Sequence, residues 1–193
     1  MKNDSDALNE ICGRIETGIE EKKRPYLIAI DGRSGSGKST LAQELSKRYG
    51  AGLYHMDDFF LQPFQRTKQR LGEIGGNVDY ERFYKEVLLP LSEDRTFTYG
   101  IFDCGQQRIV EYRDSVNVSL HIIEGSYSEH PYFGSPYDLT ICLDIDAEKQ
   151  EERIRKRNGE EMLKRFTEEW IPKENAYLDK FHIMERCDIC IKM

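Results

Sequence analysis

A glycine-rich segment limits the folds open to this chain more than any other feature. It reads Gly32-Arg-Ser-Gly-Ser-Gly-Lys-Ser39 and matches the pattern Gly-x-x-x-x-Gly-Lys-Ser. The continuous apolar run before it, residues 26–31, is typical of a strand buried on both faces. In the run after it, residues 40–48, Leu41 and Leu45 share one helix face. A strand, a glycine loop and a helix in this order predict an anion-binding loop.

The residue types of the loop fit the chemistry of a nucleoside triphosphate. Glycines allow positive φ, so the backbone can curl and point its N–H groups at phosphate oxygens. A helix that begins near Lys38 directs its positive end at the phosphates, and Lys38 reaches the β- and γ-oxygens. The Ser39 hydroxyl is a ligand for Mg²⁺ in such loops. The predicted nucleotide-binding residues are Gly32, Ser34, Gly35, Ser36, Gly37, Lys38, Ser39 and Thr40.

Further apolar runs alternate with helix-like segments along the chain. Strand patterns occupy residues 26–31, 51–55, 120–124, 139–144 and 188–192. Helical patterns occupy residues 5–22, 40–48, 79–89, 146–157 and 166–181. We expect Pro90 to close the third of these helices, Asn158-Gly159 to end the fourth, and Pro172 to break or start part of the last. This alternation predicts an α/β chain with a mostly parallel five-stranded sheet flanked by helices, the P-loop NTPase fold.

Two segments depart from this alternation. Residues 96–112 have the pattern of a β-hairpin with its turn at residues 105–107, and we predict a small hairpin insertion there. Residues 61–77 contain three glycines and several basic residues, and we expect a mobile loop. No internal repeat or long linker interrupts the chain, so residues 1–193 are predicted to be one domain, with an N-terminal helix within residues 1–24.

Acidic residues at the ends of two predicted strands are candidates for chemistry at the terminal phosphate. The carboxyl ends of parallel strands meet at one edge of the sheet, where open α/β folds bind ligands. Asp57 follows one strand, and we predict that it orients an acceptor hydroxyl and takes its proton. The alternative is that Asp57 and Asp58 are turn carboxylates. Glu124 ends another strand and is a candidate to hold Mg²⁺, with a helix N-cap or a surface acid as the alternative.

The charge, the apolar runs, the cysteines and one absent motif argue against several classes of function. The net charge of −7 argues against nucleic acid or an anionic membrane as the main partner and favours a small-molecule substrate. No apolar run approaches the length of a membrane span, and residues 1–10 lack the apolar core of a signal peptide. Five cysteines, an odd number, indicate reduced thiols and a cytoplasmic location. No guanine-reading Asn/Thr-Lys-x-Asp motif is present, which counts against a signalling GTPase.

Together these landmarks resemble the uridine kinase, nicotinamide riboside kinase and phosphoribulokinase group, and bacterial uridine kinase-like proteins above all. The resemblance extends from about residue 26 to the C-terminus. It is carried by residues 32–40, 55–60, 77–80, 122–125 and 144–147, followed by Arg153 and Arg157. It implies a single P-loop kinase domain that transfers the γ-phosphoryl group of ATP, with Mg²⁺, to a hydroxyl of a nucleoside or related riboside.

The resemblance also implies roles for individual residues. Asp57 matches the acid that accepts the proton of the acceptor hydroxyl, and Glu124 matches the acid associated with Mg²⁺. Asp79 matches an acid that hydrogen-bonds the ribose hydroxyls, although a helix N-cap is the alternative for this residue. Arg153 and Arg157 fall where such kinases place lid arginines, which implies a short lid at residues 153–162. On this view Lys38 and Arg157 are catalytic and Arg153 binds the nucleotide, and a solvated helix face is the alternative for both arginines.

The sequence departs from uridine kinases at two places. Residues 101–106 lack the histidine that reads the pyrimidine, which leaves Phe102 as the candidate to stack on a base. The lid is short after Arg157. Two other functions therefore stay open: a non-catalytic or regulatory nucleotide-binding module, and a kinase of another small hydroxyl metabolite. The sequence does not distinguish ATP from GTP or decide whether the chain forms a homo-oligomer.

Overall fold

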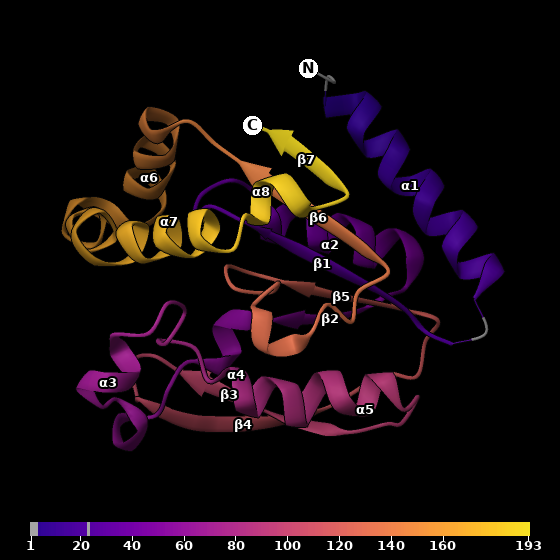
Figure 1. Ribbon diagram of the computed structural model, residues 1–193, viewed down its shortest axis with the longest axis horizontal. Helices are drawn as coiled ribbons and strands as arrows, with labels where there is room; N and C mark the ends of the chain where they lie inside the picture. Colours follow the sequence, from indigo (N-terminus) through magenta and orange to yellow (C-terminus); the bar gives the residue numbers. More distant parts are fainter. Residues whose placement is uncertain (1–3, 23) are drawn as a thin grey trace.

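The computed structural model describes residues 4–22 and 24–193, and its centre is one five-stranded sheet (Figure 1). All four neighbouring strand pairs are parallel. In spatial order the strands are β2 (Gly52–His55), β5 (Leu120–Glu124), β1 (Tyr26–Gly32), β6 (Leu139–Asp144) and β7 (Ile189–Lys192). Every residue of β1 and β5 is buried, which explains their continuous apolar sequences. The predicted α/β fold with a parallel five-stranded sheet is confirmed.

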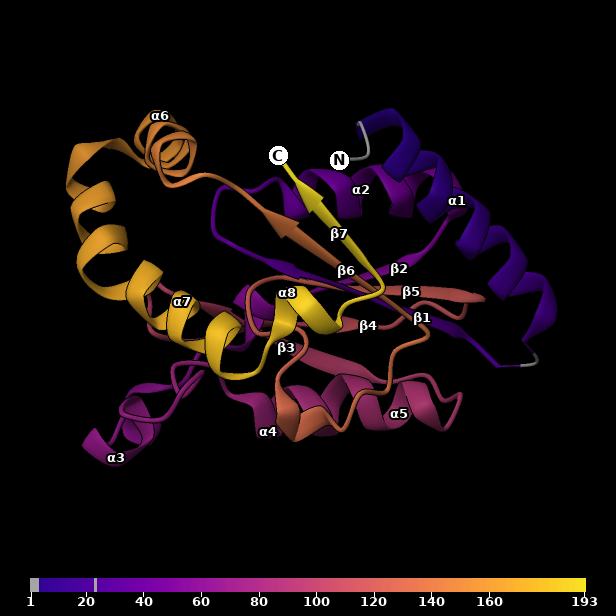
Figure 2. The ribbon, with the colours of Figure 1, turned by 45° about the horizontal axis from the view of Figure 1, so that its top comes forward.

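Helices cover both faces of the sheet (Figure 2). On one face, α1 (Asp4–Glu21) and α2 (Lys38–Tyr49) pack on the strands through a cluster that includes Ile11, Ile15 and Leu45. The helix predicted within residues 1–24 is therefore present, and residues 1–3 and 23 of that prediction lie outside the described residues. None of the helices within residues 4–22 and 24–193 combines the length and apolar character that crossing a membrane requires.

The second core, on the other face, joins the predicted hairpin to a long helix. Strands β3 (Thr98–Asp103) and β4 (Arg108–Asp114) pair antiparallel, as expected, and form a separate two-stranded sheet. Aromatic rings fill the space between this hairpin and the helix that follows residue 79. The ring centres of Phe59 and Phe83 are 4.9 Å apart, and those of Phe59 and Tyr99 are 6.2 Å apart. The hairpin is thus packed against the main body and does not project from it.

The prediction that Pro90 ends a helix is wrong. The helix continues through α4 (Tyr80–Phe83), a π-helical turn (Tyr84–Leu88) and α5 (Leu89–Ser92), which contains Pro90. The wider turn lets the Leu89 N–H bond to the Tyr84 carbonyl, so the helix can accommodate a residue that has no N–H of its own. A second π-helical turn (Phe166–Trp170) precedes α7 (Ile171–Lys180) and accommodates Pro172 in the same way.

Two other segments contain more helix than the sequence predicted. Helix α6 (Ala147–Arg165) bends sharply at Gly159, whose φ of +82° lies outside the helical region, and then continues. The predicted stop at residues 158–159 is therefore a kink. The segment of residues 61–77 contains a 3₁₀ turn (Pro63–Gln65) and the short helix α3 (Lys68–Leu71). Arg70 ties this segment to α4 through bonds of 2.6 and 2.8 Å to Glu81.

Candidate active site

The glycine loop joins β1 to α2 at the carboxyl edge of the sheet. Gly32, Gly35 and Gly37 have φ values of +128°, +77° and +102°. A Cβ atom on Gly32 would lie 2.1 Å from the carbonyl oxygen of Leu143 in the neighbouring strand, so only glycine fits there. Helix α2 begins at Lys38, and among the described residues no side chain caps its first turn. Its first N–H groups and its positive end are therefore available to an anion.

Of the side chains at the loop, those of Ser36 and Lys38 are buried, whereas Ser39 and Arg153 are exposed. The Lys38 ammonium donates to the carbonyls of Gly32 and Arg33, both at 2.9 Å. Arg153 from α6 donates to the Gly35 carbonyl at 3.1 Å, so this arginine lies at the loop, where the sequence predicted it. The buried hydroxyl of Ser36 has no hydrogen-bond partner among the described residues.

The two predicted magnesium ligands are in contact. The Ser39 hydroxyl lies 3.2 Å from both carboxylate oxygens of Glu124. Strand β5 pairs with β1 on one side and β2 on the other, which brings Glu124 beside both Ser39 and His55. His55 Nδ1 hydrogen-bonds the carboxylate, and this bond raises the pKa of His55. The sequence analysis missed His55 as a site residue, because only the strand order places it next to Glu124.

Asp57 lies in the 3₁₀ turn Met56–Phe59 that follows β2 directly. Its side chain is exposed at the surface but is crowded by protein atoms, and the resulting desolvation raises the pKa of Asp57. The negative charge of Glu124 adds to this rise, whereas Lys38 opposes it. Within residues 4–22 and 24–193 the Asp57 carboxylate forms no hydrogen bond, so its oxygens are available as acceptors.

Arg82 holds the turn that carries Asp57. Its guanidinium donates to the carbonyl of Asp58 at 2.6 Å and to the carbonyl of Gly100 in β3 at 2.8 Å. It also pairs with Glu86 at 3.1 Å and lies 4.1 Å from the centre of the Phe59 ring. One buried guanidinium therefore joins the turn, the hairpin and α4. The sequence analysis did not single out Arg82, because its partners are 18 and 24 residues away.

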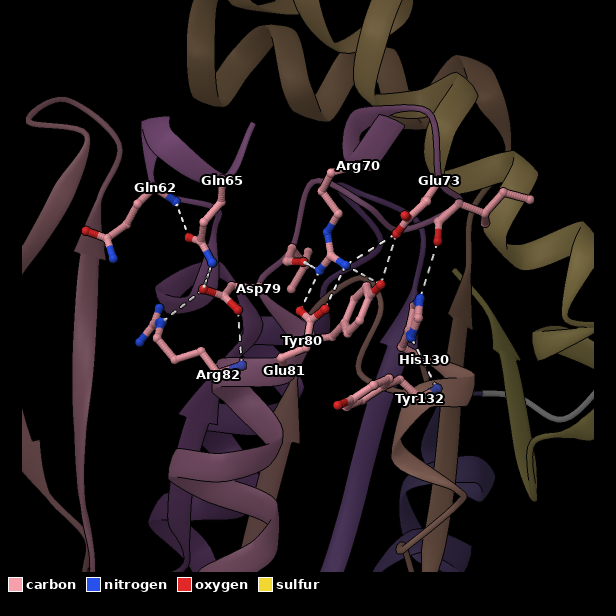
Figure 3. A network of polar contacts seen from close by, with 12 residues as sticks. Gln62, Gln65, Arg70, Glu73, Asp79, Tyr80, Glu81, Arg82, His130 and Tyr132 are labelled. Atoms are coloured by element: carbon pink, nitrogen blue, oxygen red, sulfur yellow. Dashed lines mark hydrogen bonds and ion pairs between the residues drawn. The ribbon is translucent and has the colours of Figure 1, made fainter. Parts of the chain in front are cut away.

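Asp79 is the N-cap of α4, which was the alternative to its predicted role in binding ribose hydroxyls (Figure 3). Its Oδ1 accepts the Arg82 N–H at 3.1 Å, and its Oδ2 accepts from the Gln65 side chain at 2.7 Å. The carboxylate is buried, so an acceptor molecule would have to compete with Gln65 for it. Phe102 is only 4 % exposed, and the guanidinium of Arg66 lies 6.0 Å from its ring centre.

A stack of side chains links the loop of residues 61–77 to the far side of the site (Figure 3). The Arg70 guanidinium lies 3.7 Å from the centre of the Tyr80 ring. Tyr80 in turn stacks on His130 at 4.5 Å with an interplanar angle of 13°. Tyr132 contacts Tyr80 at 4.9 Å between ring centres. The stack thus connects α3, which carries Arg70, to the start of α4 and to the segment that contains His130 and Tyr132.

The second lid arginine does not reach the glycine loop. Arg157 Nε donates to the Asn158 side chain at 2.6 Å, and its guanidinium lies 5.9 Å from the centre of the Phe166 ring. Among the described residues it forms no hydrogen bond or ion pair with residues 32–39. The structure thus brings Arg153, but not Arg157, into contact with the loop.

Helix α7 contributes a carboxylate that the sequence analysis missed. Glu174 accepts the backbone N–H of Ser34 at 3.0 Å and the Ser126 hydroxyl at 2.8 Å, and it also bonds the Ser34 hydroxyl. One turn further along α7, the Tyr177 hydroxyl donates to Asp31 at 2.7 Å. These contacts span 140 and 146 residues of sequence, so no local pattern could reveal them.

Asp31 lies directly beneath the loop at the end of β1 and is fully buried. Besides Tyr177, its carboxylate accepts the backbone N–H groups of Gly32 at 2.6 Å and Glu129 at 3.0 Å. Burial raises the pKa of Asp31, and these three hydrogen bonds oppose the rise. Asp31 thereby joins β1, the glycine loop and α7 into one unit.

Comparison with known proteins agrees with this geometry. No protein-family profile matches the chain. The chain is 28 % identical over 159 residues to the ATP-dependent kinase YFH7 of Zygosaccharomyces rouxii, a match that covers 78 % of this chain. The matched region is only 38 % of that protein, so the chain spans less than half the length of this relative.

Three solved structures share the fold along almost the whole chain. A candidate fructose transport system kinase from Silicibacter sp. TM1040 has a TM-score of 0.73 at 20 % identity, covering 95 % of this chain and 98 % of that one. A candidate uridine kinase from Bacillus stearothermophilus has a TM-score of 0.65 at 20 % identity, covering 94 % and 99 %. YFH7 of Saccharomyces cerevisiae, a candidate P-loop kinase with a circular permutation, has a TM-score of 0.66 at 15 % identity, covering 98 % of both chains. The chain therefore has the fold of the uridine kinase-like P-loop kinases.

Proposed function

We propose that this chain is an ATP- and Mg²⁺-dependent kinase that transfers the γ-phosphoryl group to a hydroxyl of a nucleoside or related riboside. One observation carries the proposal: a candidate base, a candidate metal site and the loop lysine meet at one end of the glycine loop. Ser39 and Glu124 are in contact at 3.2 Å, and His55, two residues before Asp57, hydrogen-bonds the same Glu124 carboxylate. The similarity to an ATP-dependent kinase supports the same function.

The residues at the loop fit a nucleotide with its metal. The N–H groups of the loop and of the first turn of α2 would bind phosphate oxygens, with Arg153 beside them. Ser39 and Glu124 offer a hydroxyl and two carboxylate oxygens, the donor type that Mg²⁺ prefers, and would hold the ion. The ion, when bound, neutralises charge on the transferred group.

Asp57 is the proposed base. Its carboxylate has free acceptor capacity, and a raised pKa makes it more effective at taking a proton from the acceptor hydroxyl. Arg82 fixes the turn that carries Asp57 and so sets the direction from which the hydroxyl approaches. Lys38 and Arg153 would stabilise the charge on the phosphoryl oxygens. Arg157 would join them only through a movement of the lid, residues 153–162.

The residues that would bind the acceptor molecule are less well defined than those that would bind the nucleotide. Asp79 would bind the ribose hydroxyls if they displaced Gln65 from its carboxylate. Phe102 would stack on a base only if the hairpin exposed more of its ring. The absence of the pyrimidine-reading histidine and the similarity to a candidate fructose transport system kinase favour a second candidate, a kinase of another small hydroxyl metabolite. The five free cysteines support the proposed cytoplasmic location.

The test is a coupled assay of ADP release with Mg²⁺, ATP and a panel of ribosides and free sugars. We expect ADP release with at least one acceptor, and we expect the Asp57→Asn variant to bind ATP without turnover. Binding of ATP with no turnover on any acceptor would favour the regulatory module. Absence of ATP binding by calorimetry would refute the proposal.

A further inference from the structure

The Glu174 carboxylate occupies a backbone N–H group of the glycine loop that would otherwise be free to bind a phosphate oxygen. The N–H groups of a P-loop bind phosphate oxygens, and Ser34 is the third residue of this loop. The Glu174 carboxylate accepts that N–H at 3.0 Å and is held there by the hydroxyls of Ser34 and Ser126. Carboxylate and phosphate oxygens accept the same kind of hydrogen bond from backbone N–H groups. Glu174 is 5 % exposed, so the pairing is well shielded from water.

The contacts of Ser126 indicate which phosphate would meet this carboxylate. The Ser126 hydroxyl donates to Glu174 at 2.8 Å and lies 3.3 Å from the Gly32 carbonyl, which also accepts from the Lys38 ammonium at 2.9 Å. Lys38 is the residue that reaches the β- and γ-oxygens in such loops. In the proposed reaction the acceptor hydroxyl meets the γ-phosphate beside Asp57. Glu174 is therefore at the γ-phosphate end of the loop, and the α- and β-phosphates lie further from it, towards the first turn of α2.

The helix that carries Glu174 is fixed against the loop at two further points. Tyr177 donates to the buried Asp31 at 2.7 Å. Asn175 accepts from Arg33, which also pairs with Asp144 at 2.8 Å. A γ-phosphate could move the Glu174 side chain, but α7 as a whole could not withdraw without breaking these contacts. The negative charge of Glu174 therefore stays near the terminal phosphate.

We propose that Glu174 determines how strongly the loop distinguishes a nucleoside triphosphate from a diphosphate. A triphosphate must displace the carboxylate from Ser34 and then tolerate its charge nearby, whereas a diphosphate needs neither change. Glu174 thus weakens triphosphate binding selectively. The inference rests on the proposed function, because it assumes that the loop binds a nucleotide with its γ-phosphate beside Asp57.

The test compares a nonhydrolysable ATP analogue with ADP, each with Mg²⁺, by titration calorimetry on the wild-type chain and Glu174→Gln. Glutamine has the same shape, and its amide oxygen still accepts the Ser34 N–H, but it carries no charge. We expect the ATP analogue to bind about tenfold tighter or more and ADP to change by less than about threefold. Glu168→Gln is the matched control, because this exposed carboxylate, 3.9 Å from Lys164, precedes α7. It should change neither affinity.

Two results would overturn the inference: equal changes for both nucleotides, or weaker binding of the ATP analogue by Glu174→Gln, which would mean that the carboxylate assists the triphosphate. If the wild-type chain binds neither nucleotide, the proposed function fails first. Thermal melting checks that the variant is folded. If it is not, Ser126→Ala removes one donor from the carboxylate and should also tighten the ATP analogue, by a smaller factor, without affecting ADP; no selective tightening there would equally refute the inference.

Discussion

The Arg82 guanidinium offers a sharp test of how this site is built. Its side chain is only 10 % exposed and serves two backbone carbonyls and the carboxylates of Asp79 and Glu86 at once. In Arg82→Lys the charge is kept, but a single ammonium on a flexible stem cannot reach partners on the Asp57 turn, the hairpin and the π-helical turn together. The variant therefore shows how much the several N–H donors of the planar guanidinium add to stability beyond its positive charge.

The magnitude follows from the contacts that are lost. Hydrogen bonds to charged groups contribute about 1.5–3 kcal/mol each, and lysine can replace about one of the three interactions. The ion pairs with Glu86 and Asp79 are left out of the sum, because desolvation offsets much of a buried pair. Loss of one carbonyl bond and of the stacking on Phe59 then lowers the free energy of unfolding by about 2–4 kcal/mol.

Urea denaturation followed by circular dichroism measures this loss. Arg95→Lys is the matched control, because Arg95 pairs with Glu93 at the surface and its replacement should cost less than about 0.5 kcal/mol. Calorimetry should show nearly unchanged ATP binding by Arg82→Lys, because no residue of the glycine loop contacts Arg82 among the described residues, while turnover falls as the Asp57 turn loses its support. A loss no larger than that of the control would refute the reasoning.

Three further predictions concern single side chains. Asp57→Asn should lower turnover by about 10² or more with ATP affinity nearly intact, and unchanged turnover would remove Asp57 from the mechanism. Asp79→Asn should raise the KM of the acceptor without affecting ATP binding; an unchanged KM would mean that Asp79 acts only as a helix cap, a role that asparagine also fills. Tyr177→Phe removes a donor from the buried Asp31 and should destabilise the chain at pH 7 by about 1.5–3 kcal/mol. Because burial raises the pKa of Asp31 above its ordinary value of 3.8, the folded state loses stability as the pH rises through the folded pKa, and the variant raises that pKa further. Urea titrations should therefore show a smaller deficit as the pH falls towards 4, and a deficit independent of pH would contradict this assignment.

Local sequence patterns were enough to predict the strands of the sheet and the glycine loop at the centre of the site. The glycine loop needs an apolar strand before it and a helix after it, and both are contiguous with it in the chain. Glu124 could be placed beside the loop because it ends a continuous apolar strand, and such strands lie in the middle of a parallel sheet. The contact between Ser39 and Glu124 also depends on the pairing of β5 with β1, which the structure provides.

The residues that escaped prediction act over long stretches of chain. Glu174 lies in a segment whose pattern indicates only a helix, and its partners Ser34 and Ser126 become neighbours only when α7 folds over the loop. His55 required the order of the strands, and Arg82 required the position of the hairpin. Periodicity reveals which face of an element is buried, but it does not reveal which element covers that face.

The two π-helical turns have a consequence for changes in the length of the chain. Each contains, in effect, one residue more than a regular helix would need at that point. Deleting a residue from the turn Tyr84–Leu88 would remove this extra residue and restore regular winding, with Leu91 still facing the core. In the regular helix the Pro90 ring would then meet a carbonyl of the preceding turn, a clash that the wider turn avoids. The wide turn and Pro90 therefore depend on each other, and a one-residue deletion here would be tolerated only together with replacement of Pro90.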